Sequence, residues 1–434
     1  MHCTKRHLDR DRSLHGGAVV SILALVLAFA ASCSDATSES EPSPEPDAGT
    51  DISSPGPDGS TEDVSPPSAP PVREVKCTEK PCAVGLSAAS LSGAAFCALL
   101  DDGRVACWGM DDGSGVLGRS APDGGAFAGV GLPALVENVS GAVALERTCA
   151  LLGGGTVQCW GPGAGTLPFA GVTELAKGYT NRCAAVGPNA WSCIAGIYAP
   201  GPNGETTGTY PQRSFQAPEG APLRQLFVGD AVANGGGLPA DATFLVREDG
   251  SLLSSGARNF IGRETSLSPA DPYFGEVALQ GVTDLSVGNH VCAVANGKVH
   301  CWGSRVAKIH PDDPLPIPIE IPEAAVRVAA VGLVEVDPPE PPIPRLCAIG
   351  ASGSVYCSGP NSAGQVGDGT RDVAYAAVPV KELPDPAVSL AATYTATCAL
   401  VASGKVYCWG SGAAGAIGNG PAADALTPVL VQLP

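Results

Sequence analysis

A stretch of about a dozen residues recurs along this chain and restricts the folds that are open to it. Its clearest copy runs from Cys398 to Gly410, with apolar and polar residues alternating on both sides of a turn-forming centre. Such alternation is typical of two short antiparallel strands joined by a tight hairpin turn. The remaining copies begin at Cys97, Cys149, Cys183, Phe244, Cys292 and Cys347. The chain is therefore predicted to be a series of hairpins.

The cysteine spacing predicts a disulfide across six of the seven hairpins. A three-residue loop centred on Asp102 sets Cys97 opposite Cys107. In the shorter copy, the two-residue turn Asn296-Gly297 has the same effect. The cysteines should then occupy a non-hydrogen-bonded pair, where the Cα atoms are close enough for a disulfide. Free buried thiols and a zinc site are the alternatives, although zinc ligands usually stand two to four residues apart. The predicted pairs are Cys97–Cys107, Cys149–Cys159, Cys183–Cys193, Cys292–Cys301, Cys347–Cys357 and Cys398–Cys408, with Cys77–Cys82 as an additional local pair.

The turn residues agree with this register. The last position of a three-residue hairpin loop usually needs a left-handed backbone, which glycine adopts without strain. In the copies of this length that position holds Gly103, Gly155, Asn189, Gly250, Gly353 and Gly404. In the copy without cysteines, Phe244 and Ser254 replace both cysteines together, as expected for two partners in one bond.

Composition favours an all-β protein that does not bind nucleic acid. The 434 residues include 56 glycines and 40 prolines, which are frequent where many short strands are joined by turns. The formal net charge is −18, whereas neutralising phosphates requires a basic face.

The first 76 residues are predicted to precede the fold. Residues 1–33 combine a basic start, an apolar run from Ala18 to Ala30, and Cys33 after small residues, which is typical of a secretory signal. The position of Cys33 resembles the lipobox of bacterial lipoproteins, which implies lipidation; ordinary cleavage and a retained helix are the alternatives. Residues 34–76 carry ten acids and two bases and are expected to form a disordered tether. We therefore expect an exported, lipid-anchored monomer at the outer membrane or cell surface, with no other contact with the membrane.

The hairpins recur with a mean period of about 50 residues, which is typical of a propeller whose blades are the repeats, here within residues 77–434. Other short pieces recur between them: Gly115-Val-Leu-Gly118, Gly364-Gln-Val-Gly367, Gly415-Ala-Ile-Gly418 and the apolar segment Pro428 to Val431. Together with the hairpins, these pieces resemble the regulator of chromosome condensation repeat (alpha-tubulin suppressor-like) in an exported bacterial lipoprotein. The resemblance implies a seven-bladed β-propeller. We expect Ala83 to Phe96 and the final strand at Pro428 to Leu433 to share one split blade that closes the ring.

The chain contains none of the common catalytic motifs, and we predict no catalytic residue, cofactor or metal. Beyond the first 33 residues the histidines are His290, expected to make a structural turn contact, His300, expected to be exposed on a strand, and His310, in a Pro-rich loop. The segment Asp111 to Gly115 could chelate calcium weakly, but turn formation is the favoured interpretation. The repeated Trp108, Trp160, Trp302 and Trp409 are expected to be packing residues.

Two stretches that break the period, Ala195 to Asp241 and Val334 to Arg345, are candidate binding loops, since loops on a rigid scaffold often bind partners. Tolerated surface insertions are the alternative. Candidate contact residues are Tyr198, Tyr210, Arg213, Asp337, Glu340 and Arg345. The predicted function is a non-enzymatic propeller that binds a protein or a surface polymer. One alternative is a hydrolase or lyase acting on polysaccharide or peptide through carboxylates that converge on the central channel. The family resemblance adds another alternative, an inhibitor of a secreted enzyme.

Overall fold

The computed structural model describes most of the chain from residue 73 onward, and residues from 65 to the C-terminus form one compact unit. The predicted signal sequence, Cys33 and the tether up to residue 72 lie outside the described residues. The described ranges are 73–90, 94–111, 113–119, 132–161, 164–178, 182–194, 212–231, 240–267, 270–288, 290–303, 315–331, 345–420 and 423–434. Within them, no helix combines the length and apolar character needed to span a membrane.

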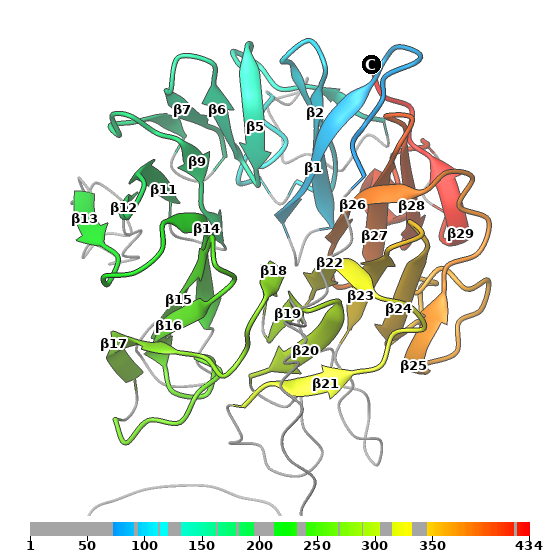
Figure 1. Ribbon diagram of the computed structural model, residues 1–434. Coiled ribbons are helices and arrows are strands. Elements are labelled where there is room, and N and C mark those ends of the chain that lie inside the picture. The colour runs from blue at the N-terminus through cyan, green and yellow to red at the C-terminus, as the bar shows by residue number, and fades with distance from the viewer. Residues whose placement is uncertain are drawn as a thin grey trace, which may run out of the picture. The chain divides into compact units, whose positions relative to one another are not determined.

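Seven sheets stand in a ring, so the predicted seven-bladed all-β propeller is confirmed (Figure 1). Each sheet is one blade, and its strands follow one another from the centre of the ring outward. Blade 1 contains β1 (Ala83–Ser90), β2 (Ala95–Leu100), β3 (Val105–Gly109) and β4 (Ala134–Leu135). Blade 2 contains β5 (Ala142–Glu146), β6 (Cys149–Leu152), β7 (Val157–Cys159) and β8 (Gly165–Leu167). Blade 3 contains β9 (Glu174–Leu175), β11 (Arg182–Gly187), β12 (Ala190–Ile194) and β13 (Gln212–Gln216).

The remaining blades follow the same order, and the fourth has one additional strand. Blade 4 contains β10 (Lys177–Gly178), β14 (Leu223–Ala231), β15 (Ala240–Arg247), β16 (Leu252–Ala257) and β17 (Ala270–Glu276). Blade 5 contains β18 (Val282–Val287), β19 (Val291–Ala295), β20 (Lys298–Trp302) and β21 (Ile317–Ile319). Blade 6 contains β22 (Ala325–Ala330), β23 (Leu346–Gly350), β24 (Val355–Gly359) and β25 (Ala374–Pro379). Blade 7 contains β26 (Ala387–Ala392), β27 (Ala396–Val401), β28 (Val406–Gly410), the 3₁₀ turn η1 (Ala413–Gly415) and β29 (Ala425–Leu430).

The predicted hairpin register and the six cross-strand disulfides are confirmed. Cys97 pairs with Cys107 across β2 and β3, and Cys292 pairs with Cys301 across β19 and β20. The Cα separation in all six hairpins is 4.0–4.1 Å, as expected for a non-hydrogen-bonded pair. Phe244 and Ser254 occupy the same register in blade 4. A seventh disulfide joins Cys77 to Cys82. Bonds of this kind persist in oxidising compartments, which fits an extracellular environment.

The predicted left-handed loop position holds for the glycines but is wrong for Asn189. Gly103, Gly250 and Gly404 all have φ near +80°, whereas the φ of Asn189 is not positive. A register shift between Ala185 and Gly187 lengthens β11 at its end. The turn of blade 3 is consequently shortened to Pro188-Asn189, in which proline fixes a negative φ at the first position.

The repeated tryptophans join neighbouring blades. In four blades the indole N–H that follows the second cysteine donates to a backbone carbonyl in the preceding blade. The pairs are Trp108 with Ala416, Trp160 with Val116, Trp302 with Phe260 and Trp409 with Gln365, at 2.7–3.2 Å. Three of these tryptophans are at most 1% exposed and Trp160 is 6% exposed, so their predicted packing role is confirmed. Each acceptor lies in a Gly-x-x-Gly segment or its equivalent, which explains why that segment recurs.

The prediction of a split blade is wrong. The last strand, β29, pairs with β28, and the first strand, β1, pairs with β2, so the termini lie in adjacent complete blades. The ring is closed by contacts between blades 7 and 1, where Ala83 N donates to Gly404 O at 2.8 Å. Apolar residues from both blades, including Phe96, Leu400 and Ile417, form one buried cluster there. Closure therefore uses the same tryptophan hydrogen bond as three other blade junctions, together with apolar packing.

Candidate functional site

A cavity of about 690 Å³ lies at the centre of the ring, bounded mainly by inner strands of six of the seven blades. These strands are β1, β5, β14, β18, β22 and β26, together with the short strand β10 (Figure 1). The first described residues, Arg73 to Val75, also line the cavity. A register shift interrupts the pairing of six of these strands at the same point, one residue after each begins. Bulges of this kind redirect side chains, and they make the lining a set of equivalent positions.

One pair of equivalent positions is charged and paired across adjacent blades. Asp284 on β18 accepts a hydrogen bond from the guanidinium of Arg327 on β22 at 3.1 Å and another from the backbone N–H of Val328 at 2.9 Å. The Asp284 side chain is only 4% exposed, so these partners compensate the loss of its hydration. Arg224 on β14 donates to the carbonyl of Val282 in the next blade. These contacts leave little of the Asp284 charge for a ligand.

Glu146, at the end of β5, has a carboxyl group without a hydrogen-bond partner among the described residues. Burial raises its pKa to about 7, although Lys177 and Arg147 lower the pKa and Glu174 raises it slightly. The Glu146 side chain is partly exposed to the cavity and is otherwise surrounded by protein. The pKa of Glu174 on β9 is also raised by burial and is lowered by Lys177 and Arg224. Two glutamates from adjacent blades therefore share one basic neighbour.

Lys177 is held by the strand that connects blades 3 and 4. In the parallel pair of β10 and β14, Lys177 lies opposite Phe227, and its ammonium stands 5.3 Å from the centre of the Phe227 ring. Its nitrogen forms no ion pair with a described residue, so this cation–π contact is its main direct contact. Arg147 is fixed differently, because its backbone N–H donates to Ser87 Oγ at 2.8 Å and its guanidinium to Ala89 O at 3.1 Å.

Another part of the lining consists of small apolar residues from blades 6, 7 and 1. They include Ala329, Ala330, Ala391, Ala392 and Ala88. Alanine leaves space that longer side chains would fill, and it offers no hydrogen bonds. Besides the Asp284–Arg327 pair, the cavity thus has a charged surface from blades 2 and 4 and a surface of small apolar residues from blades 6, 7 and 1. We call these two surfaces the charged wall (Glu146, Arg147, Lys177) and the alanine wall.

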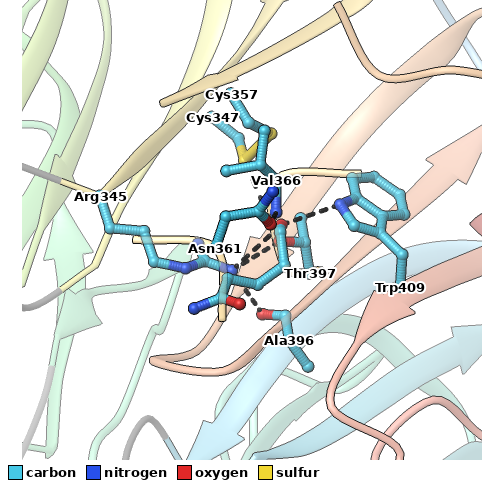
Figure 2. Close-up of a disulfide and its surroundings, with 9 residues drawn as sticks. Arg345, Cys347, Cys357, Asn361, Val366, Ala396, Thr397 and Trp409 are labelled. Carbon is cyan, nitrogen blue, oxygen red and sulfur yellow. Dashed lines mark hydrogen bonds between the residues drawn. A yellow bond between two sulfur atoms is a disulfide. The ribbon is translucent and has the colours of Figure 1, made fainter. Parts of the chain in front are cut away.

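Arg345, predicted to belong to an exposed binding loop, is instead 1% exposed, and the prediction is wrong for this residue. Figure 2 shows its guanidinium directed toward blade 7, where it donates to Ala396 O at 3.1 Å and Thr397 Oγ1 at 2.7 Å. Thr397 and Trp409 in turn donate to Gln365 O, so Arg345 belongs to a network that joins blades 6 and 7. Burial lowers its pKa to about 9. The adjacent prolines suggested a loop, but Arg345 directly precedes β23.

The other predicted loop residues mostly lie outside the described residues, namely Tyr198, Tyr210, Asp337 and Glu340. Arg213 is a residue of β13. The stretch from 195 to 241 was predicted to be loop-like, but it contains β13 and β14. Its apolar run from Leu226 to Val228 is buried and forms part of a first strand, which explains this difference.

The surroundings of the histidines and of Asp111 indicate structural roles for these residues. His290 is completely buried, its pKa is lowered to about 4 by burial, and neither ring nitrogen has a partner among the described residues. Its carbonyl accepts the Gly288 N–H at 2.8 Å, the expected turn contact. His300 is half-buried rather than exposed, and burial lowers its pKa. His310 lies outside the described ranges.

The Asp111 carboxylate accepts backbone N–H groups of Gly113, Gly115 and Leu117 at 2.9–3.3 Å, which is turn formation. The described residues include no group of three or more His, Cys, Asp or Glu side chains arranged to hold a metal ion. Asp112 lies outside the described ranges. The calcium interpretation therefore has no support from the geometry of Asp111.

Sequence reasoning missed Glu146 and Lys177. One sequence pattern does point to this region. The motif Gly171-Val-Thr-Glu174 repeats as Gly281-Val-Thr-Asp284, and the two copies mark the first strands of blades 3 and 5. Aligning first strands rather than hairpins would have placed Asp284 at the channel.

Residues 387–416, from β26 to η1, match the regulator of chromosome condensation (RCC1) repeat model. No curated protein matches the chain significantly. Among solved structures, Prp20p from Saccharomyces cerevisiae is 17% identical, with a TM-score of 0.47, 81% of this chain covered and 77% of the other. Human WBSCR16 is 13% identical, with a TM-score of 0.49 and 83% of each chain covered. The ectodomain of the Arabidopsis thaliana receptor kinase ACR4 is 18% identical, with a TM-score of 0.39, 78% of this chain covered and 94% of the other. At these identities and TM-scores, the likeness concerns the fold alone.

Proposed function

We propose that this chain is an exported, RCC1-like binding propeller that takes part of a protein or surface polymer into its central channel. The observation that carries the proposal is the cavity of about 690 Å³, which is bounded by strands of six blades and whose lining includes the charged wall and the alanine wall. A purely structural centre would be expected to be filled with apolar side chains at the density of a protein core. Pockets of this size with a few polar groups on rigid elements are typical binding sites.

The charge distribution supports binding through the channel rather than through the outer surface. The whole chain is acidic, with a formal net charge of −18, yet the cavity lining holds four basic residues and only three acidic ones: Arg73, Arg147, Lys177 and Arg327 against Glu74, Glu146 and Asp284. Disulfides fix the register of the second and third strands in six blades, and the cavity-lining first strands pair with these second strands. Export and lipid anchoring at Cys33 remain part of the proposal, and they rest on the sequence of residues 1–33.

The test is an affinity capture with the full chain, oxidised and immobilised, against envelope and extracellular fractions of the source organism. We expect a specific partner that is lost when the cavity is filled by Ala330→Phe. The control is Leu430→Phe, which adds the same ring on the exposed outer strand β29, where Leu430 is 46% exposed. Thermal unfolding of both variants then serves to verify that they are folded. A partner retained by Ala330→Phe would contradict binding through the channel.

The second candidate function is hydrolysis, and Glu146 is the observation that favours it. A carboxyl whose pKa is near 7 can act as a general acid, and Glu174 from the adjacent blade could supply a second carboxylate. Turnover of a polysaccharide or peptide that is abolished by Glu146→Gln would establish an enzyme. Inhibition of a secreted enzyme stays a prediction, for which the described residues give no specific argument.

A further inference from the structure

The two walls of the channel indicate the chemistry of its ligand, an inference that rests on the binding function proposed above. On the charged wall, the ammonium of Lys177 has the face of Phe227 as its direct contact. On the alanine wall, Ala329, Ala330 and Ala392 are each between 5% and 7% exposed and belong to buried clusters, so the small surface that they leave to the cavity carries no charged side chain. A ligand that satisfies both surfaces has one anionic end and an apolar body.

Two of the acids that line the cavity, Asp284 and Glu146, do not cancel this preference. Asp284 is compensated by Arg327 and by the N–H of Val328. Glu146 has no such partner, and a protonated Glu146 would offer an O–H donor instead of a negative charge. The charged groups that face Glu146 are Lys177 and Arg147, from the strands around it, and Glu174. With Glu146 protonated, the charged wall therefore carries the two cations Arg147 and Lys177.

We propose that the channel binds an aliphatic carboxylate, with the carboxylate between Lys177 and Glu146 and the aliphatic body against the alanine wall. Two ligands share this chemistry, a free aliphatic acid and the C-terminal residue of a peptide with aliphatic side chains. A cavity of about 690 Å³ has room for either one. The channel suits a sugar less well, because Phe227 is the one aromatic residue among the described residues that line it, and Lys177 covers its face.

The position of Glu146 makes the binding depend on pH. Its pKa of about 7 means that about nine tenths of the molecules carry the proton at pH 6 and about one tenth at pH 8. Deprotonation places a second carboxylate beside that of the ligand, and like charges at a shared site repel. Affinity should consequently fall about tenfold from pH 6 to pH 8.

The experiment is isothermal titration of the full-length oxidised protein with two probes, hexanoate and the acetylated peptide Ala-Val-Leu with a free C-terminus. The same peptide with an amidated C-terminus is the control ligand. We expect binding of the acids and none of the amide. Binding of the peptide acid alone would assign the source to a peptide terminus, and binding of hexanoate at equal affinity would assign it to a free acid.

Two variants test the assigned residues. Lys177→Met should weaken binding at least tenfold, whereas Lys381→Met, which removes an exposed lysine on another blade, should not. In Glu146→Gln, the tenfold difference between pH 6 and pH 8 should shrink to less than twofold, because an amide carries no charge at either pH. Equal binding of acid and amide, or unchanged affinity in Lys177→Met, would overturn the assignment. If neither acid binds but Ala330→Phe still abolishes partner capture, the carboxylate inference fails and the binding function stands.

Discussion

The indole N–H of Trp108 donates to the carbonyl oxygen of Ala416, 3.2 Å away, and thereby joins the first blade to the last. Trp409 makes the same contact with Gln365 between blades 6 and 7, at 3.0 Å. The junction between the two ends of the propeller thus uses the same hydrogen bond as a junction inside it. No exchange of strands between the termini is required.

Removal of this hydrogen bond should destabilise the propeller. In Trp108→Phe, the buried carbonyl of Ala416 loses its donor, so we expect the free energy of unfolding to fall by about 1 to 3 kcal/mol beyond the effect of lost volume. Urea denaturation measures the change. The control is Trp191→Phe, because Trp191 is also buried but its indole makes no hydrogen bond to a described residue. Equal losses in the two variants would show that the hydrogen bond is unimportant.

The second glycine of each Gly-x-x-Gly segment should be intolerant of a side chain. A Cβ atom on Gly367 would lie 2.6 Å from Trp409 Nε1, and the φ of this glycine is +82°. Gly141 has a similar φ of +69°, but nothing lies within 4 Å of its Cβ position. We expect Gly141→Ala to cost about 1 to 2 kcal/mol for the backbone alone, and Gly367→Ala to cost about 1 to 3 kcal/mol more. Equal costs in thermal or urea denaturation would exclude a steric role for this glycine.

The sequence was sufficient to predict the blades because the hairpin signal is local. The register of Cys97 opposite Cys107 follows from the strand alternation and a glycine in the turn. Ring closure could not be predicted in this way, since a strand such as Ala425–Leu430 can pair with either β28 or β1 and nothing in its residues decides between them. The correct choice depends on how Trp108 packs against blade 7.

The charged wall could not be predicted from local sequence patterns either. Glu146 and Lys177 are far apart in the sequence, and the curvature of the ring brings them to the same cavity. Arg345 shows the opposite error, because its Pro-rich neighbours suggested exposure. Its burial depends on Ala396 and Thr397 of the next blade, which the sequence around Arg345 does not reveal.

Removing a single disulfide should weaken the propeller without changing its fold. In Cys347→Ala/Cys357→Ala, the closed loop of the unfolded chain is released, and we expect a loss of up to about 3 kcal/mol in the free energy of unfolding. Blade 4 shows that a blade can do without this bond. There Ser254 Oγ donates to Ile261 O at 2.6 Å, and Arg263 bridges Ser254 and Asp271.

Reduction with dithiothreitol supplies the matching control for blade 4. Ser254→Ala should destabilise the oxidised and the reduced protein by the same amount, because its contacts involve no thiol. The loss in Cys347→Ala/Cys357→Ala should disappear under reduction, when the wild-type chain has also lost its disulfides. A loss that persisted in the reduced protein would show that the cysteines stabilise blade 6 by packing alone.

His290 should make the propeller less stable in acid. Burial lowers its pKa in the folded state to about 4, below the ordinary value of 6.5, so the unfolded chain binds a proton more readily between these two pH values. Its contribution to stability is therefore complete above pH 6.5 and is lost as the pH falls toward 4, by about 3 kcal/mol in total. Glu146 acts in the opposite direction, because its raised pKa lowers stability as the pH rises from 4.5 to 7.

The two contributions can be separated by substitution. Urea denaturation of wild type and Glu146→Gln between pH 4 and pH 8 isolates the effect of Glu146. In the Glu146→Gln background, His290→Gln should remove most of the remaining loss between pH 6.5 and pH 4, because the amide does not titrate. If the double variant loses as much stability in acid as Glu146→Gln alone, His290 is not the group whose protonation opens the fold. The burial of an unpartnered imidazole between Gly288 and β19 then has no consequence for acid stability.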